Sequence, residues 1–266
     1  MDFRGASAEA VAELTDELKE SPSKKAAAIG EALLSAAETL RQEVAARRFL
    51  TDGSIPKEPK VGMIREVFGS RVDEQALDVI VSAVSRRWRH GTDLTDALER
   101  LSEVAAVLSS DDPGRLSDEL FEVRRLIDHN PALRDALSDP ARSTEDKSAL
   151  VEQVLGDKVQ PATVALTRQA LLGSYGTVSA ALGAYRTLAG EVHGKSVATV
   201  HVASPLSDEQ FRQLTDGLGQ QYGREIHANV VVDPSVIGGL RVEIGNDVID
   251  GTIASRLDET RRRLAG

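Results

Sequence analysis

Residues 231–257 read VVDPSVIGGLRVEIGNDVIDGTIASRL, and this stretch decides the fold of the C-terminal part of the chain. Within it, LRVEI at 240–244 alternates apolar and charged residues, which predicts a half-buried strand. The Gly-Asn pair at 245–246 predicts a two-residue hairpin turn into a short strand at 247–250. The stretch therefore predicts a β-hairpin that leads into a final helix.

The residues just before this stretch predict the rest of a small sheet. The segment 196–203 is SVATVHVA, a β-branched run typical of a strand, and 226–232 predicts a second strand. Ser207 and Gln210 form a capping box, which predicts a helix that runs to about Tyr222. We therefore expect residues 193–266 to form a C-terminal α/β domain.

Upstream of this domain the sequence repeats itself. A shift of 87 residues places 11–105 on 98–192 without a gap. One register that satisfies many core positions favours a duplication over two Ala/Leu-rich stretches that agree by chance. The matched pairs include Leu14/Leu101, Leu33/Leu120, Arg47/Arg134, Leu50/Leu137, Val67/Val154, Ala83/Ala170 and, in kind, Trp88/Tyr175.

Each repeat carries the apolar spacing of amphipathic helices. The stripe from Ile29 to Val44 recurs from Leu116 to Ile127, and Asp112-Pro113-Gly114 predicts a turn before the second stripe. We predict a mainly α fold with a small α+β C-terminal domain: two tandem helical bundles followed by a small mixed sheet with helices. The expected domains are residues 1–97, 98–192 and 193–266.

Composition excludes several classes of function. The net charge is −10, so a broad acidic surface would repel phosphate backbones and nucleic-acid binding is disfavoured. The chain has no cysteine, which removes disulfides, thiolate nucleophiles and cysteine-based metal sites. No apolar run is long enough to span a bilayer and no signal peptide is evident, so we expect only indirect membrane contact.

One segment imitates a phosphate-binding loop. Residues 189–196 read AGEVHGKS, with Ala in place of the usual first Gly. A phosphate loop lies between a strand and the start of a helix, whose amides point at the phosphates. Here a helix is expected before the segment and a strand after it, so we interpret Gly194-Lys195 as a helix end and linker. A P-loop enzyme is the alternative.

Other candidates for chemistry are weak. The five histidines show no metal-ligand spacing, and no G-x-S-x-G motif is present. We therefore expect no catalytic, cofactor-binding or metal-binding residues.

Residues 86–90, RRWRH, are the densest basic and aromatic cluster, which would suit nucleic-acid contact. The alternative, which the repeat favours, is a bundle helix with Trp88 packed inward and its arginines solvated.

The C-terminal stretch resembles the signature of the delta subunit of F-type ATP synthase, the oligomycin-sensitivity-conferring protein family. The residues from 130 to 188 also look like the second half of that family's helical domain. The resemblance implies structural rather than catalytic roles, with a sharp bend at the Gly pair and a hairpin end that caps the last helix. The signature residues are Asp233, Pro234, Gly238, Gly239, Gly245, Asp250, Gly251, Arg256 and Leu257.

The resemblance implies a non-catalytic stator subunit of the peripheral stalk, without cofactors. Its expected partners are the N-terminal helices of the alpha subunits and the b-type stalk subunit, at the cytoplasmic face of the cell membrane. Such a subunit holds the catalytic head still against rotor torque during proton-driven ATP synthesis. A helical adaptor unrelated to ATP synthase is the alternative.

The duplication departs from the family pattern, because the usual member has one helical domain. We expect the second copy, 98–192, to keep the family's contact with the head. The first copy would then be an added brace that touches the stalk or a neighbouring alpha subunit. The sequence leaves open whether the chain stands alone or belongs to a fusion with a b-like segment.

Overall fold

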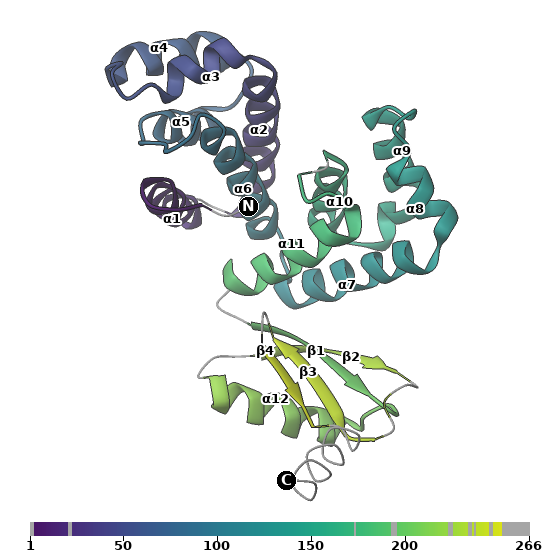
Figure 1. The fold of residues 1–266 in the computed structure, drawn as a ribbon. Helices are drawn as coiled ribbons and strands as arrows, with labels where there is room; N and C mark the ends of the chain where they lie inside the picture. The colour runs from purple at the N-terminus through teal and green to yellow at the C-terminus, as the bar shows by residue number, and fades with distance from the viewer. Residues whose placement is uncertain are drawn as a thin grey trace, which may run out of the picture. The chain divides into compact units, whose positions relative to one another are not determined.

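The chain is mainly helical with one small mixed sheet, which confirms the predicted fold class. The computed structural model describes residues 3–20, 23–172, 174–192, 196–222, 226–233, 236, 238–244 and 247–251 (Figure 1). It divides into two compact units, Met1–Asp111 with Ser138–Val178, and Asp112–Leu137 with Ser179–Gly266. The predicted division into three domains stays a prediction.

The first unit is entirely helical in its described residues. Its core is formed mainly by Leu, Ile and Ala, and its widest packing contact joins α2 to α6. The helices are α1 (Ala6–Lys19), α2 (Ser23–Gln42), α3 (Val44–Thr51), α4 (Lys57–Phe68), α5 (Glu74–Val84), α6 (Asp93–Leu108), α9 (Thr144–Leu155) and α10 (Pro161–Gln169), with 3-10 turns η1 (Gly156–Lys158) and η2 (Ala170–Leu172).

The second unit combines helices with the sheet. The described strands have the order β2-β1-β3-β4, with β1 parallel to β2 and antiparallel to β3, and with β3 antiparallel to β4. The strands expected from the sequence are thereby confirmed. The elements are α7 (Pro113–His129), α8 (Pro131–Ser138), α11 (Val178–Val192), β1 (Ser196–Val202), α12 (Asp208–Tyr222), β2 (Ile226–Val232), β3 (Leu240–Ile244) and β4 (Asp247–Asp250).

One face of this sheet packs against α12 (Figure 1). The strands place every second residue on that face, and Leu218 of α12 completes the core. The alternation predicted for 240–244 is confirmed, because Val242 is 1% exposed whereas Arg241 is exposed.

A side-chain cap starts α12 as the sequence predicts. Ser207 Oγ accepts from Gln210 N at 3.3 Å, and Gln210 Oε1 accepts from Ser207 N at 2.9 Å, so the capping box is complete.

The expected turn at Asp112-Pro113-Gly114 was wrong. Asp112 is the N-cap of α7, accepting from Arg115 N at 3.1 Å, and Pro113 is the first helical residue, where its missing N–H costs nothing.

The helices recur with the register found in the sequence. Adding 87 to the bounds of α3 gives 131 and 138, the bounds of α8. The same shift takes α4 onto α9, α2 onto α7, and the start of α5 onto the start of α10. It also takes α1 onto α6 and α6 onto α11. Helix α6 therefore corresponds to the last helix of the first repeat and to the first helix of the second, and this agreement supports the predicted duplication.

Burial of α6 differs from that of α1, its counterpart in the repeat. Helix α1 buries a single stripe: Ser7, Ala10, Leu14 and Leu18. Helix α6 buries every residue from 101 to 107, nearly two full turns, because α1, α2, α5 and α10 all pack against it.

The contact between α2 and α6 depends on a glycine. A Cβ at Gly30 would lie 3.2 Å from Ser102 O and 3.3 Å from Ala105 Cβ. The missing side chain lets the two backbones approach closely. At Gly62 in α4, by contrast, a Cβ would meet nothing within 4 Å.

These two glycines give a matched stability test. We expect Gly30→Leu to lower the free energy of unfolding by roughly 3 kcal/mol, because its side chain must push α2 away from α6. Gly62→Leu should raise it by about 0.5 kcal/mol, because leucine has the better helix propensity and open space. Urea unfolding of both variants measures the difference, and equal effects at the two positions would contradict the packing described here.

Candidate functional site

The segment that imitates a phosphate loop lacks the required surroundings. Helix α11 ends at Val192 and strand β1 begins at Ser196, so the predicted order of helix before strand is confirmed. A helix C-terminus carries the negative end of the dipole and free carbonyl groups, both unfavourable for a phosphate. Residues 193–195 themselves lie outside the described part of the chain.

Within the described residues, no group of three or more His, Cys, Asp or Glu side chains could hold a metal ion. No helix there is long and apolar enough to cross a membrane.

Several signature residues lie where the sheet begins and ends its hairpin. Asp233 follows β2, donates its amide to Val202 O at 2.8 Å, and accepts from Val236 N at 3.0 Å. Gly239 has a φ of 80°, a left-handed conformation that favours glycine directly before β3.

The residue that follows β4 is hydrogen-bonded to the first residue of β3. Gly251 N donates to Leu240 O at 2.9 Å, and a Cβ at Gly251 would lie 3.3 Å from that oxygen. Asp250 of β4 lies opposite Arg241 of β3 in the antiparallel register. Gly238 lies just before β3. These geometries suit scaffold residues. The remaining signature residues, Pro234, Gly245, Arg256 and Leu257, lie outside the described residues.

The most unusual chemistry in the first unit is a pair of buried carboxylates on α6. Glu99 and Glu103 are both 0% exposed, and they lie four residues apart on the same side of the helix. Arg41 of α2 donates to Glu99 Oε2 at 2.5 Å, while Glu99 Oε1 has no hydrogen-bond partner among the described residues. Burying a charge is costly unless it is paired, and Arg41 supplies the opposite charge beside Glu99.

Glu103 is held by a different set of partners. Tyr175 donates its hydroxyl to both carboxylate oxygens, at 2.8 and 3.0 Å, and Arg100 donates to Oε2 at 3.1 Å. Next to it, Ser102 donates to Gln169 Oε1 at 3.2 Å, and Gln169 Nε2 donates to Glu99 O at 3.2 Å. Helix α6 is thus bonded both to α2 and to Gln169 and Tyr175 of the second repeat.

Burial is the largest influence on the pKa values of Glu103 and Tyr175. It raises the pKa of Glu103 to about 7, against the opposing influence of Arg100 and Tyr175. It also raises the pKa of Tyr175, and the charge of Glu103 adds to that shift. Glu103 therefore titrates near neutral pH.

A partly buried charge, Arg186, lies in the second unit. Arg186 of α11 donates to Thr199 Oγ1 of β1 at 2.6 Å, and its guanidinium lies 5.2 Å from the centre of the Phe121 ring of α7. Burial lowers the pKa of Arg186 to about 10, with the neighbouring charge of Arg124 as the second cause. Arg186 joins two helices of this unit to the sheet.

These charged residues do not stand out in the sequence. Glu99 and Glu103 look like ordinary helix-surface residues, and only the apolar run around them, LERLSEVAAVL at 98–108, gives a signal. Arg186 is the residue to which the 87-residue shift takes Glu99. The two repeats therefore carry opposite charges at the same position of their last helix, and Glu99 is the fully buried one.

Comparisons with known proteins identify the family. The family model described as ATP synthase delta (OSCP) subunit matches residues 101–264. ATP synthase subunit delta of Nocardioides sp. is 45% identical over 99% of this chain and 98% of its own length. The namesake from Kineococcus radiotolerans is 41% identical over 89% of this chain and 87% of its own length. That from Streptomyces avermitilis is 38% identical over all of both chains.

Among solved structures, a chain of the Toxoplasma gondii mitochondrial ATP synthase hexamer covers 59% of this chain and 99% of its own length, with 19% identity and a TM-score of 0.38. The sequence relatives extend over both predicted repeats and the sheet domain. The chain belongs to the ATP synthase delta (OSCP) subunit family. This confirms the resemblance found in the sequence, and an unrelated helical adaptor is not favoured.

The pKa of Glu103 predicts a specific pH dependence of stability. Its folded pKa, about 7, lies above the ordinary value of 4.5. Its contribution to stability is therefore fully present below pH 4.5 and is lost as the pH rises through 7. One pH unit between the two pKa values corresponds to about 1.4 kcal/mol, so the loss is on the order of 3 kcal/mol.

We expect Glu103→Gln to remove this dependence, because an amide stays neutral and can still accept from Tyr175. Urea unfolding of wild type and variant between pH 5 and 8 measures it, with the exposed Glu31→Gln as control. Parallel stability curves for wild type and Glu103→Gln would show that Glu103 does not titrate in this range.

The contacts of Arg186 predict that it is energetically coupled to Thr199. We expect Arg186→Ala to lower the free energy of unfolding by about 2 kcal/mol, because Thr199 loses its partner and Phe121 its stacked cation. In a double-mutant cycle with Thr199→Val, the coupling energy should be about 1 kcal/mol. Arg125, which also lies over Phe121 but is about half exposed, is the control. Arg125→Ala should cost less than about 0.5 kcal/mol, and an equal cost at both positions would contradict the proposed role of Arg186.

Proposed function

We propose that the chain is a non-catalytic stator subunit of the peripheral stalk of F-type ATP synthase. It links the catalytic head, through the N-terminal helices of the alpha subunits, to the b-type stalk subunit, so that the head resists rotor torque during ATP synthesis. The observation that carries this proposal is the family match over 101–264, together with relatives named subunit delta over nearly the full chain. The proposed location is the cytoplasmic face of the cell membrane, reached through the complex.

The duplication is part of the proposal. The family model begins at residue 101, inside α6, so the first repeat precedes the matched region. We propose domains at 1–97, 98–192 and 193–266, with the second repeat in contact with the head and the first as an added brace. The recurrence of the helix bounds at a shift of 87 supports the duplication, with α6 shared by the two repeats.

Helix α6 suits such a brace. Since it corresponds to the last helix of one repeat and the first of the next, no flexible linker separates the two repeats at this point. Its complete burial between 101 and 107 and its bonds to α2 and to the second repeat resist bending there. A connector that carries torque needs stiffness of this kind rather than a reactive centre. The signature residues that the structure describes, Asp233, Gly238, Gly239, Asp250 and Gly251, fit the proposal as scaffold positions of the sheet.

A binding experiment with the full chain tests the proposal. The catalytic head prepared without this subunit, and the b-type stalk subunit, are each immobilised and exposed to the purified chain. We expect both to capture it, because the proposed connector contacts each of them. A head that already carries this subunit is the control and should capture much less. Capture by neither the empty head nor the stalk subunit would overturn the stator function.

A further inference from the structure

The segment between α5 and α6, residues 85–92, is a fixed loop, so the helix expected at 86–90 was wrong, although Trp88 does pack inward. Trp88 is 9% exposed and donates Nε1–H to Ala83 O at 2.9 Å. The buried hydroxyl of Ser7 accepts from Arg89 N at 2.9 Å and donates to Asp93 Oδ2 at 2.6 Å. The ring and the two polar anchors hold the loop backbone in one conformation.

This fixed loop presents basic side chains to solvent. Arg87, Arg89 and His90 are all exposed. The loop lies against the end of α3, because a Cβ at Gly91 would be 3.6 Å from Thr51 Oγ1.

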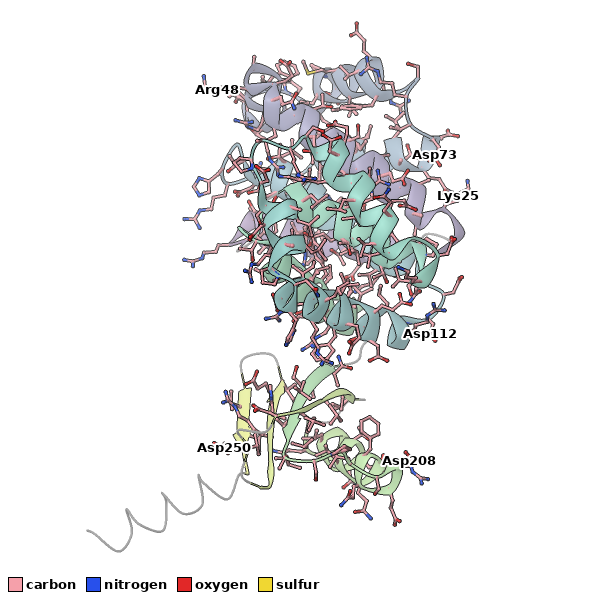
Figure 2. The ribbon with its side chains drawn as sticks, turned by 90° about the vertical axis from the view of Figure 1, so that its right-hand side faces the viewer. Lys25, Arg48, Asp73, Asp112, Asp208 and Asp250 are labelled. Carbon is pink, nitrogen blue, oxygen red and sulfur yellow. The ribbon has the colours of Figure 1, made fainter. Side chains whose placement is uncertain are left out.

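Helix α3 adds a further cation on the same side. Arg48 precedes Thr51 by three residues, so both lie on one side of α3. Its side chain is exposed and extends outward (Figure 2). We call Arg48, Arg87, Arg89 and His90 the basic patch.

The three arginines of the basic patch are not used by the fold. Their neighbour Arg86 pairs with Glu13 and Glu17 of α1. Arg48, Arg87 and Arg89, by contrast, have no ion pair with any residue that the structure describes. The carboxylate of Asp52, at the end of α3, accepts from Ser54 N and Oγ at 2.8 and 2.7 Å and is engaged in its own turn.

The second repeat shows that this fold forms without the patch. A shift of 87 takes the four patch residues to Asp135, Ser174, Gly176 and Thr177, one acidic and three uncharged residues. The helices on either side keep their register, and the aromatic position is kept as Tyr175. The charges therefore have no structural role that the repeated fold requires, and in a chain of net charge −10 they stand out as a local positive surface.

We propose that the basic patch is a docking surface for an acidic segment of another polypeptide of the ATP synthase, on the head or the stalk. This inference rests on the proposed function. Guanidinium groups bind carboxylates with paired hydrogen bonds, and arginine is enriched in protein interfaces. The anchored loop is already ordered, so little conformational entropy is lost when a partner binds. An extended polyanion such as nucleic acid or an anionic membrane would also meet the acidic remainder of a chain of net charge −10, whereas a short acidic segment can contact the patch alone.

A charge-removal variant of the full chain tests this surface. Arg48→Gln, Arg87→Gln and Arg89→Gln are combined, and the matched control combines Arg65→Gln, Arg71→Gln and Arg168→Gln, which removes three other exposed arginines. Thermal unfolding checks that both are folded. Binding is measured to the head without this subunit, the b-type subunit, duplex DNA, and phosphatidylcholine–phosphatidylglycerol vesicles, at 50 and 300 mM salt.

We expect the patch variant to bind the head or the stalk subunit about tenfold more weakly than wild type at 50 mM salt, with a smaller difference at 300 mM. The control should stay within about twofold. Unchanged binding of the patch variant to both proteins would overturn this inference alone. A loss confined to DNA or vesicles would also overturn it. Wild type that binds neither protein would overturn the stator function itself.

Discussion

The structure depends on the burial of one helix from every side. An amphipathic helix ordinarily buries one stripe and leaves the rest to solvent, as α1 does. Helix α6 has no solvent face between 101 and 107, because α1, α2, α5 and α10 surround it. The close approach at Gly30 and the paired charge of Glu99 are consequences of that crowding.

The same constraint accounts for the polar groups inside the first unit. Close packing already restrains the rotation of α6, and Glu99 and Glu103 restrain it further because each must meet its own partner. The opposite charge at the equivalent position, Arg186, serves the second repeat differently by reaching the sheet at Thr199. After the proposed duplication, the two copies would thus have kept the position of their helices and changed what the last helix binds.

Much of the fold could be predicted from the sequence because it is encoded locally. The alternation at 240–244, the capping box at Ser207 and the repeat register all place elements at their observed positions. The prediction failed at Asp112-Pro113-Gly114, since the same residues that favour a turn also favour a helix start. Glu103 and Arg186 could not be predicted, because their burial depends on partners distant in the sequence. Of the proposed binding surface, the basic run at 86–90 is visible in the sequence, whereas its anchoring by Ser7 and its position beside α3 are not.

Native-state hydrogen exchange of the full chain tests most directly whether α6 joins the two repeats. Exchange of the amides in α2, α6 and α10 is followed at increasing denaturant below the unfolding transition. If α6 couples the repeats, the three helices should exchange through one common opening with the same free energy and denaturant dependence. Exchange of α2 through a smaller opening that leaves α6 and α10 protected would contradict the account.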